Sequence, residues 1–225
     1  MGRPIRLTLV LSLLLANLTA AAGNPSPPTI FLSPMIVTGG LKSIATITLP
    51  SPAPAEGVIV RLTASNVGST YASDPTMRQV VSLPEQVLVP AGRAFATFPI
   101  ETMPVAAAAT VSISASVSEI SAVAKLSVVP PSLERTRLHS GFVHGGKSIT
   151  GEVTLNGPAP EGGFTVKLKS YNEQIATTPT AVTVPAGKST ATFTVQTKQV
   201  TSPTWVTIGA SSPMMTSTAP LRVMP

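Results

Sequence analysis

Alternating apolar and polar residues, the pattern of a β-strand with one buried face, recur along almost the whole chain of 225 residues. The clearest case is the stretch from Val182 to Val195, where apolar residues alternate with threonines after a Pro-Ala-Gly turn. The stretch from Val87 to Ile100 repeats it, with Phe98 in the place of Phe193. We therefore predict two equivalent hairpins in which Phe98 and Phe193 are buried and the residues between the apolar positions face solvent.

A proline and a glycine mark the turn of each hairpin. Pro90 and Pro185 suit the first corner of a type I turn, and Gly92 and Gly187 follow two positions later, where that turn favours glycine. The pattern predicts a tight reversal between two strands in each copy.

The hairpins belong to a longer internal repeat. Gly39-Gly40 returns as Gly145-Gly146, and Pro52-Ala53-Pro54 returns as Pro158-Ala159-Pro160. We expect the glycine pair to break the opening strand of each half. Each half predicts seven short strands and no helix, so the expected fold is all-β, with two tandem immunoglobulin-like β-sandwiches at residues 29–129 and 131–225. The connector, residues 128–132, contains two consecutive prolines and should be stiff.

The repeated motifs have a recognisable family resemblance. They are a Gly-Gly pair, Pro-Ala-Pro-x-Gly-Gly at residues 158–163, and Val-Pro-Ala-Gly followed by Ala-Thr-Phe-x-Val at residues 184–195. This set resembles the tandem immunoglobulin-like or fibronectin-like repeats of bacterial exported proteins. The resemblance implies a stalk, a spacer or an adhesive module. The first copy departs from it at Ala55-Glu56-Gly57, and the antibody-type cysteine pair is missing.

The first residues predict export. Arg3 and Arg6 precede an apolar run at residues 7–15 and three alanines at residues 20–22, which is the pattern of a signal peptide at residues 1–22. The alternative is a membrane anchor, but the run is shorter than the roughly 20 apolar residues of a spanning helix. We expect cleavage after Ala22, an extended leader at residues 23–28, no membrane span in the mature chain, and a secreted protein in the periplasm or outside the cell.

Composition argues against several functions. The chain has no cysteine, which removes disulfides, thiol catalysis and thiolate metal sites. Charged residues make up 11% of it, the formal charge is +6, and its Lys and Arg are scattered, so we expect no nucleic-acid partner.

Catalytic and metal-binding groups are sparse as well. The acids are Asp74 and eight glutamates, no Gly-x-Ser-x-Gly elbow occurs, and Glu56, Asp74 and Glu85 are too far apart in sequence to suggest a calcium loop. His139 and His144 are expected to be surface residues. We predict no catalytic residue, no metal and no cofactor.

Two places could bind a partner. Trp205 falls on an outward strand position, where it either shields the sheet or forms a ligand platform. Tyr71 and Tyr171 are the other candidate platforms, and the three aromatic residues lie at separate places in the sequence. The second place is the loop at residues 67–84.

This loop is longer in the first copy than in the second. The spacing of equivalent residues falls from 106 (Gly39 to Gly145) to 95 (Val87 to Val182), so the first copy holds 11 more residues. Its candidate residues are Tyr71, Asp74, Met77 and Arg78. They either bind a partner or brace the two halves, with Tyr71 and Met77 against Met214 and Met215.

The sequence thus indicates a non-enzymatic structural or adhesive module pair of the bacterial cell exterior. The alternative is a pair of carbohydrate-binding modules. The expected partner is accordingly a cell-surface protein or a polysaccharide.

Overall fold

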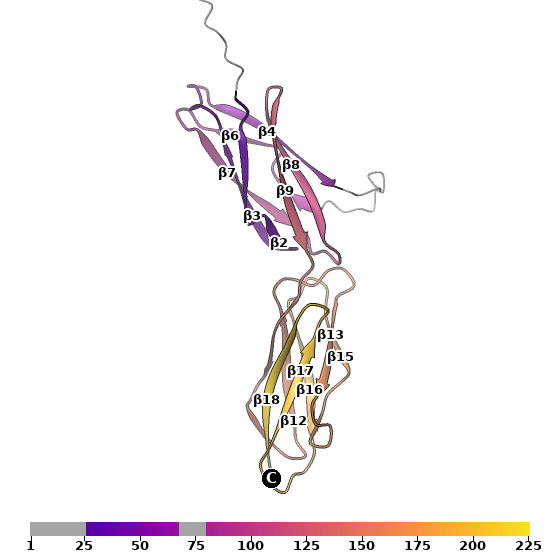
Figure 1. The fold of residues 1–225 in the computed structure, drawn as a ribbon. Helices are drawn as coiled ribbons and strands as arrows, with labels where there is room; N and C mark the ends of the chain where they lie inside the picture. Colours follow the sequence, from indigo (N-terminus) through magenta and orange to yellow (C-terminus); the bar gives the residue numbers. More distant parts are fainter. Residues whose placement is uncertain (1–25, 68–79) are drawn as a thin grey trace, which may run out of the picture.

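The computed structural model describes residues 26–67 and 80–225. Within these residues the chain is all-β, as the alternation predicts, and it forms two β-sandwiches in tandem (Figure 1). The predicted signal peptide lies outside the described residues.

The first sandwich consists of a four-stranded sheet in the order β1-β3-β7-β5 and a five-stranded sheet in the order β2-β9-β8-β4-β6. The strands are β1 (Thr29–Ser33), β2 (Ile36–Thr38), β3 (Lys42–Thr48), β4 (Val58–Val67), β5 (Val81–Ser82), β6 (Gln86–Val89), β7 (Phe95–Thr102), β8 (Ala109–Val117) and β9 (Ile120–Val129).

The second sandwich repeats this plan, with sheets in the orders β10-β12-β16-β14 and β11-β18-β17-β13-β15. The strands are β10 (Leu133–Leu138), β11 (Phe142–His144), β12 (Ser148–Leu155), β13 (Phe164–Ser170), β14 (Ala176–Thr177), β15 (Ala181–Val184), β16 (Thr190–Thr197), β17 (Thr204–Ser211) and β18 (Thr216–Met224).

The strand order is that of an immunoglobulin-like sandwich. Strands β1, β3 and β7 take the places of strands A, B and E, and β9, β8 and β4 take those of G, F and C. Neighbouring strands are antiparallel except β2 with β9 and β11 with β18, which are parallel. The predicted fold class is therefore confirmed.

The described part of each half contains nine strands rather than the predicted seven. The predicted break at Gly39-Gly40 is present as the turn between β2 and β3, but the opening strand has a second break at Pro34 and Met35, which the sequence analysis missed. There the chain leaves β1, which pairs with β3, and crosses to the other sheet as β2. Proline lacks the N–H that a continuing ladder needs. The other additional strands, β5 and β14, have two residues each and are too short to leave a sequence pattern.

The turns of the two repeated hairpins differ from the prediction by one residue. The backbone N–H of Arg93 donates to the carbonyl of Pro90 at 3.0 Å, so Pro90 is the first residue of its turn and Gly92 is the third. Gly92 has a φ of 70°, and Gly187 in the second hairpin has 73°. A positive φ at the third position is typical of a type II turn, which glycine adopts without strain. The predicted type I turn was wrong, because the glycine occupies the third position of the turn, where its positive φ requires type II, and not the fourth.

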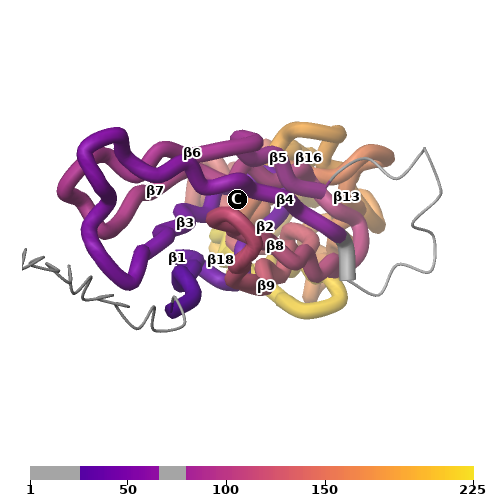
Figure 2. The backbone as a smooth tube through the Cα atoms, turned by 90° about the horizontal axis from the view of Figure 1, so that it is seen from above, coloured from indigo at the N-terminus to yellow at the C-terminus, as the bar shows by residue number. Residues whose placement is uncertain are grey.

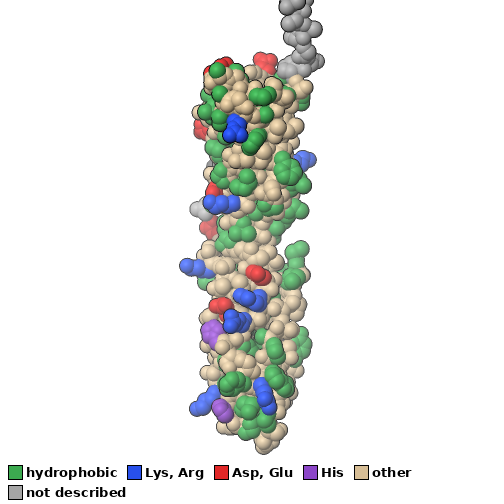
Figure 3. All heavy atoms as spheres, turned by 90° about the vertical axis from the view of Figure 1, so that its left-hand side faces the viewer, with side chains coloured by type: hydrophobic (Ala, Val, Ile, Leu, Met, Phe, Trp, Pro, Cys, Tyr) green, Lys and Arg blue, Asp and Glu red, His purple; other side chains and the backbone are tan. Residues whose placement is uncertain are grey.

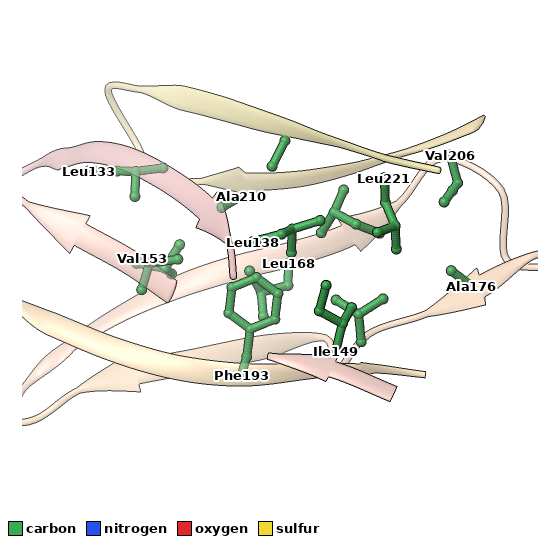
Figure 4. Packing of buried hydrophobic residues seen from close by; sticks show 14 of the residues in the cluster. Leu133, Leu138, Ile149, Val153, Leu168, Ala176, Phe193, Val206, Ala210 and Leu221 are labelled. Atoms are coloured by element: carbon green, nitrogen blue, oxygen red, sulfur yellow. The ribbon is translucent and has the colours of Figure 1, made fainter. Parts of the chain in front are cut away.

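The predicted strand faces are correct for both phenylalanines. Phe98 is 4% exposed and Phe193 is 5% exposed. Figure 4 shows the Phe193 ring pointing into the space between the sheets, among Ile149 and Leu168. The ring lies directly against Gly151, since a Cβ at this position would fall 2.7 Å from the ring atom Cε2. The second core is thus fitted around one large ring and one residue without a side chain.

The two sandwiches lie end to end, and we call this arrangement the rod. Figure 1 shows the length of the rod, and in Figure 2, which looks along it, the two halves overlap. At the junction a Cβ on Gly157 would fall 2.6 Å from Cγ2 of Thr38, and Gly40 lies directly against the ring of Pro158. Small residues therefore let the two ends approach closely. Beside this contact is a hollow of about 390 Å³, lined by residues of both sandwiches: Val80, Met103, Pro104, Val105, Ala159, Glu161, Ala186 and Gly187.

Hydrogen bonds hold both ends of the connector. The N–H of Gly39 donates to the carbonyl of Val129 at 2.9 Å, on the side of the first sandwich. On the side of the second, the N–H of Ser132 donates to Oδ1 of Asn156 at 2.8 Å. The N–H of Asn156 donates back to the carbonyl of Ser132 at 3.1 Å. Only Pro130 and Pro131 remain between these bonds, and both have a fixed φ.

Candidate functional site

The outer face of the five-stranded sheet in the second sandwich carries three exposed aromatic side chains. Phe142 on β11, Trp205 on β17 and Tyr171 just after β13 are 62%, 63% and 59% exposed. Together with Lys169 and Arg222 we call them the aromatic face. Rings of this size are usually covered in a folded protein, so three on one sheet face indicate a surface that contacts something else.

Strand register places Phe142, Arg222 and Trp205 in one row across the sheet. Arg222 on β18 is the partner of Phe142 on the parallel strand β11 and of Trp205 on the antiparallel strand β17. The N–H of Arg222 also donates to the carbonyl of Gly141 at 2.9 Å, which fixes the start of β11 beside β18. The row is therefore built by backbone pairing between segments far apart in sequence.

The row surrounds a hollow. Its volume is about 480 Å³, and Gly141, Phe142, Trp205, Arg222 and Met224 line it. The guanidinium carbon of Arg222 lies 6.0 Å from the centroid of the Trp205 ring, at the outer limit of a cation–π contact. The hollow thus offers a flat indole and a cation side by side, in the size range of small-ligand sites.

Tyr171 extends the aromatic face along the sheet. Its N–H donates to the carbonyl of Thr207 at 3.0 Å, two residues beyond Trp205 on β17. Its ring covers Gly209, where a Cβ would fall 2.9 Å from the ring atom Cε2. Nζ of Lys169 lies 5.5 Å from the centroid of the same ring. A second aromatic ring with its own cation therefore stands next to the first.

The charged side chains on the strands of this sheet are all basic. Its five strands contain Lys167, Lys169 and Arg222 and no aspartate or glutamate. The nearest acid that follows the face along the chain is Glu173, two residues after Tyr171. Elsewhere the positive charge is scattered, and on the side shown in Figure 3 Lys and Arg are spread along both sandwiches. The aromatic face is thus a local site that favours an anionic ligand.

In the described residues of the first sandwich, the equivalent backbone positions carry different side chains. By strand register, Ile36, Ser65, Thr110 and Ser127 take the places of Phe142, Tyr171, Trp205 and Arg222. The repeat has therefore kept its core and changed its surface.

The structure answers part of the sequence-based site predictions. Trp205 is exposed, as its strand position predicts, and it borders a hollow. Tyr171 is not at a separate place, because it shares a face with Trp205. Phe142 and Arg222 were missed, although a position-by-position comparison of the two repeats shows an isoleucine and a serine in their places.

The second predicted site is the loop at residues 67–84. Tyr71, Asp74, Met77 and Arg78 all lie outside the described residues. Met214 and Met215, their predicted contacts, are 82% and 49% exposed. The bracing role of the loop stays a prediction.

The remaining candidate groups are at the surface. His139 and His144 are both exposed, and Nδ1 of His144 lies 2.8 Å from the carbonyl oxygen of Pro225. Across residues 26–67 and 80–225, no three His, Asp or Glu side chains are grouped so that they could hold a metal ion. The same residues include no helix long and apolar enough to cross a membrane.

Comparison with known proteins gives only distant similarities. No protein-family model matches the chain, and no curated protein matches it. A solved C-terminal fragment of intimin, in complex with the intimin-binding domain of the translocated intimin receptor, is 14% identical with a TM-score of 0.36. The match covers 87% of this chain and 63% of that fragment.

Two further solved structures are similar at the same level. Elastase-activated α-2-macroglobulin of Escherichia coli is 13% identical, with a TM-score of 0.36 and 91% of this chain but 22% of that one covered. The titin domains z1z2 in complex with telethonin are 10% identical, with a TM-score of 0.31, 90% of this chain and 98% of that one covered. The chain thus spans less than two thirds of the intimin fragment and of α-2-macroglobulin. Its immunoglobulin-like fold rests on its own strand topology.

Proposed function

We propose that the chain is a non-enzymatic binding module of the bacterial cell exterior, in which a stiff pair of sandwiches presents the aromatic face of the second. The observation that carries this proposal is the difference between the two repeats. Their cores and turns are equivalent, yet only the second places Phe142, Tyr171, Trp205 and Arg222 on its outer sheet. The first sandwich exposes Phe31 and Phe95 on its four-stranded sheet, but the described residues of its five-stranded sheet have no aromatic row, so the fold does not require this row and binding is the role that accounts for it.

The first sandwich fits a spacing role within this function. It stands between the N-terminal residues and the aromatic face, and hydrogen bonds fix the connector on both sides. A spacer of this kind keeps a binding surface at a set distance from its point of attachment. This is the structural and adhesive role that the repeat pattern indicates.

A pair of carbohydrate-binding modules is the second candidate. The observation that favours it is the hollow beside Trp205, because a flat aromatic ring next to a polar group suits the apolar face and hydroxyl groups of a sugar. Thr110 takes the place of Trp205 in the first sandwich, so one binding module and one spacer fit the described residues better than two binding modules.

Export is the first requirement of this function. We predict that the chain expressed in a bacterial host appears outside the cytoplasm with an N-terminus at or near Gly23, since residues 1–22 have the n-region, h-region and small residues of a signal peptide. N-terminal mass spectrometry of the periplasmic and secreted fractions measures this. Replacing Arg3 and Arg6 by glutamate should reduce the exported amount, whereas replacing the exposed Arg135 and Arg137 by glutamate, the same change of charge outside the signal, should not.

An intact N-terminus in the membrane fraction would contradict the prediction of cleavage. A chain found only in the cytoplasm would contradict the proposed location. Either result is independent of what the aromatic face binds.

A further inference from the structure

We propose that the aromatic face binds an acidic polysaccharide, with sugar rings stacked on Trp205 and Tyr171 and carboxylate groups paired with Arg222 and Lys169. This inference rests on the proposed function and adds the chemical class of the ligand. It follows from three properties of the face: its flat rings, its positive charge, and its two separate pairs of a ring and a cation, which we call stations.

The rings supply the stacking surface. Trp205 is 63% exposed, so an indole face is open to a ligand, and the hollow of about 480 Å³ beside it is bounded by Phe142 and Met224. Sugars have an apolar side made of C–H groups, and burying it against an aromatic ring removes apolar surface from water. A hollow of this size accepts a small part of a polysaccharide chain.

The cations supply the selectivity for acid. Arg222 lines the hollow, and its planar guanidinium can donate two parallel hydrogen bonds to a carboxylate. No described salt bridge engages Arg222 or Lys169, and the strands of this sheet contain no acid to compete for them. A neutral sugar would leave this positive charge unpaired.

The two stations indicate an extended ligand. Each consists of one ring and one cation, Trp205 with Arg222 and Tyr171 with Lys169, at 6.0 Å and 5.5 Å. The outward residues between them on β17 and β18 are Thr207 and Pro220, which are partners in the ladder. A chain of acidic sugars can meet both stations in turn.

Two other classes of partner fit less well. A protein interface needs a contiguous apolar core, but here Thr207 on β17 lies between the rings of Trp205 and Tyr171. An anionic membrane would be met by aromatic and basic residues gathered in one cluster, whereas here Thr207 and Pro220 lie between the two pairs of a ring and a cation.

The chain allows a direct test because Trp205 is its only tryptophan. Tryptophan fluorescence of the full chain is titrated with oligogalacturonate, and in parallel with its methyl ester, which has the same rings without charge. We expect a saturable change with the acid and at least about tenfold weaker binding of the ester, because the charge-assisted hydrogen bonds are lost. Arg222→Gln should weaken binding of the acid by about the same factor. The matched control is Lys125→Gln, which removes one exposed cation from β9 of the first sandwich and should change nothing.

The outcomes separate the classes of ligand. Equal binding of the acid and the ester, or equal affinity of Arg222→Gln and the wild type, would overturn the assignment of an acidic ligand. A response to vesicles of anionic phospholipid with none to oligogalacturonate would overturn it in favour of a membrane. No response to either probe would overturn the inference, while normal export with surface exposure would leave the proposed function standing.

Discussion

Replacing Phe193 by alanine should lower the free energy of unfolding of the second sandwich by about 3 to 5 kcal/mol. The ring is 5% exposed and fills the space between the two sheets, and Gly151 beneath it has no side chain with which to fill a cavity. The loss is a large part of the stability of a small domain, typically about 5 to 15 kcal/mol. Chemical denaturation followed by tryptophan fluorescence measures it, since Trp205 lies in the second sandwich.

Two controls make this result specific. Thr192→Ala changes the neighbouring exposed residue on the same strand and should shift the free energy by no more than about 0.5 kcal/mol. Phe98→Ala removes the equivalent ring of the first sandwich and should leave the fluorescence transition of Trp205 nearly in place. Equal midpoints for Phe193→Ala and Thr192→Ala would show that the faces of β16 are assigned wrongly.

Replacing Gly40 by leucine should change the angle between the sandwiches. Gly40 has a φ of 88°, and a Cβ there would fall 2.9 Å from Cδ of Pro158 in the second sandwich and still nearer its Cγ. A leucine must therefore displace Pro158 and the end of the sandwich that carries it. Small-angle X-ray scattering of the two proteins should give clearly different distance distributions.

The matched control is the equivalent glycine of the second repeat. Gly146 has a φ of 79°, and the nearest atom to a Cβ there is Nε2 of Gln199, at 3.1 Å on a flexible side chain. Gly146→Leu carries the same backbone strain, about 1 to 2 kcal/mol, but meets nothing across the junction. Scattering curves that change equally for both variants would mean that local strain, and not contact across the junction, is responsible.

The sequence predicts the faces and the core well because each depends on local alternation. Phe98, Phe193 and Trp205 can be assigned to the inside or outside from their neighbours alone. Because the two repeats are similar, each strand can be predicted twice, once in each copy. A wrong assignment in one copy then disagrees with the other.

The site is less predictable because it depends on pairing between distant segments. Phe142 reaches Trp205 only because β11 leaves the sheet of β10 and joins β18 in parallel, and a short parallel strand has no signature of its own. Arg222 becomes part of the site through its register with both neighbours. The predicted type of the turn at Gly92 was wrong because the sequence does not show which turn position the glycine occupies. Its positive φ in the structure shows this.

The two sandwiches should form a stiff rod that presents the aromatic face, and a distance measurement across the junction tests this most directly. The chain has no cysteine, so Thr97→Cys and Thr192→Cys place one spin label on each sandwich at exposed, equivalent positions of β7 and β16. Double electron–electron resonance should then give a single narrow distance peak, because hydrogen bonds hold both ends of the connector. A broad distribution, like that of two domains on a flexible linker, would contradict the claim.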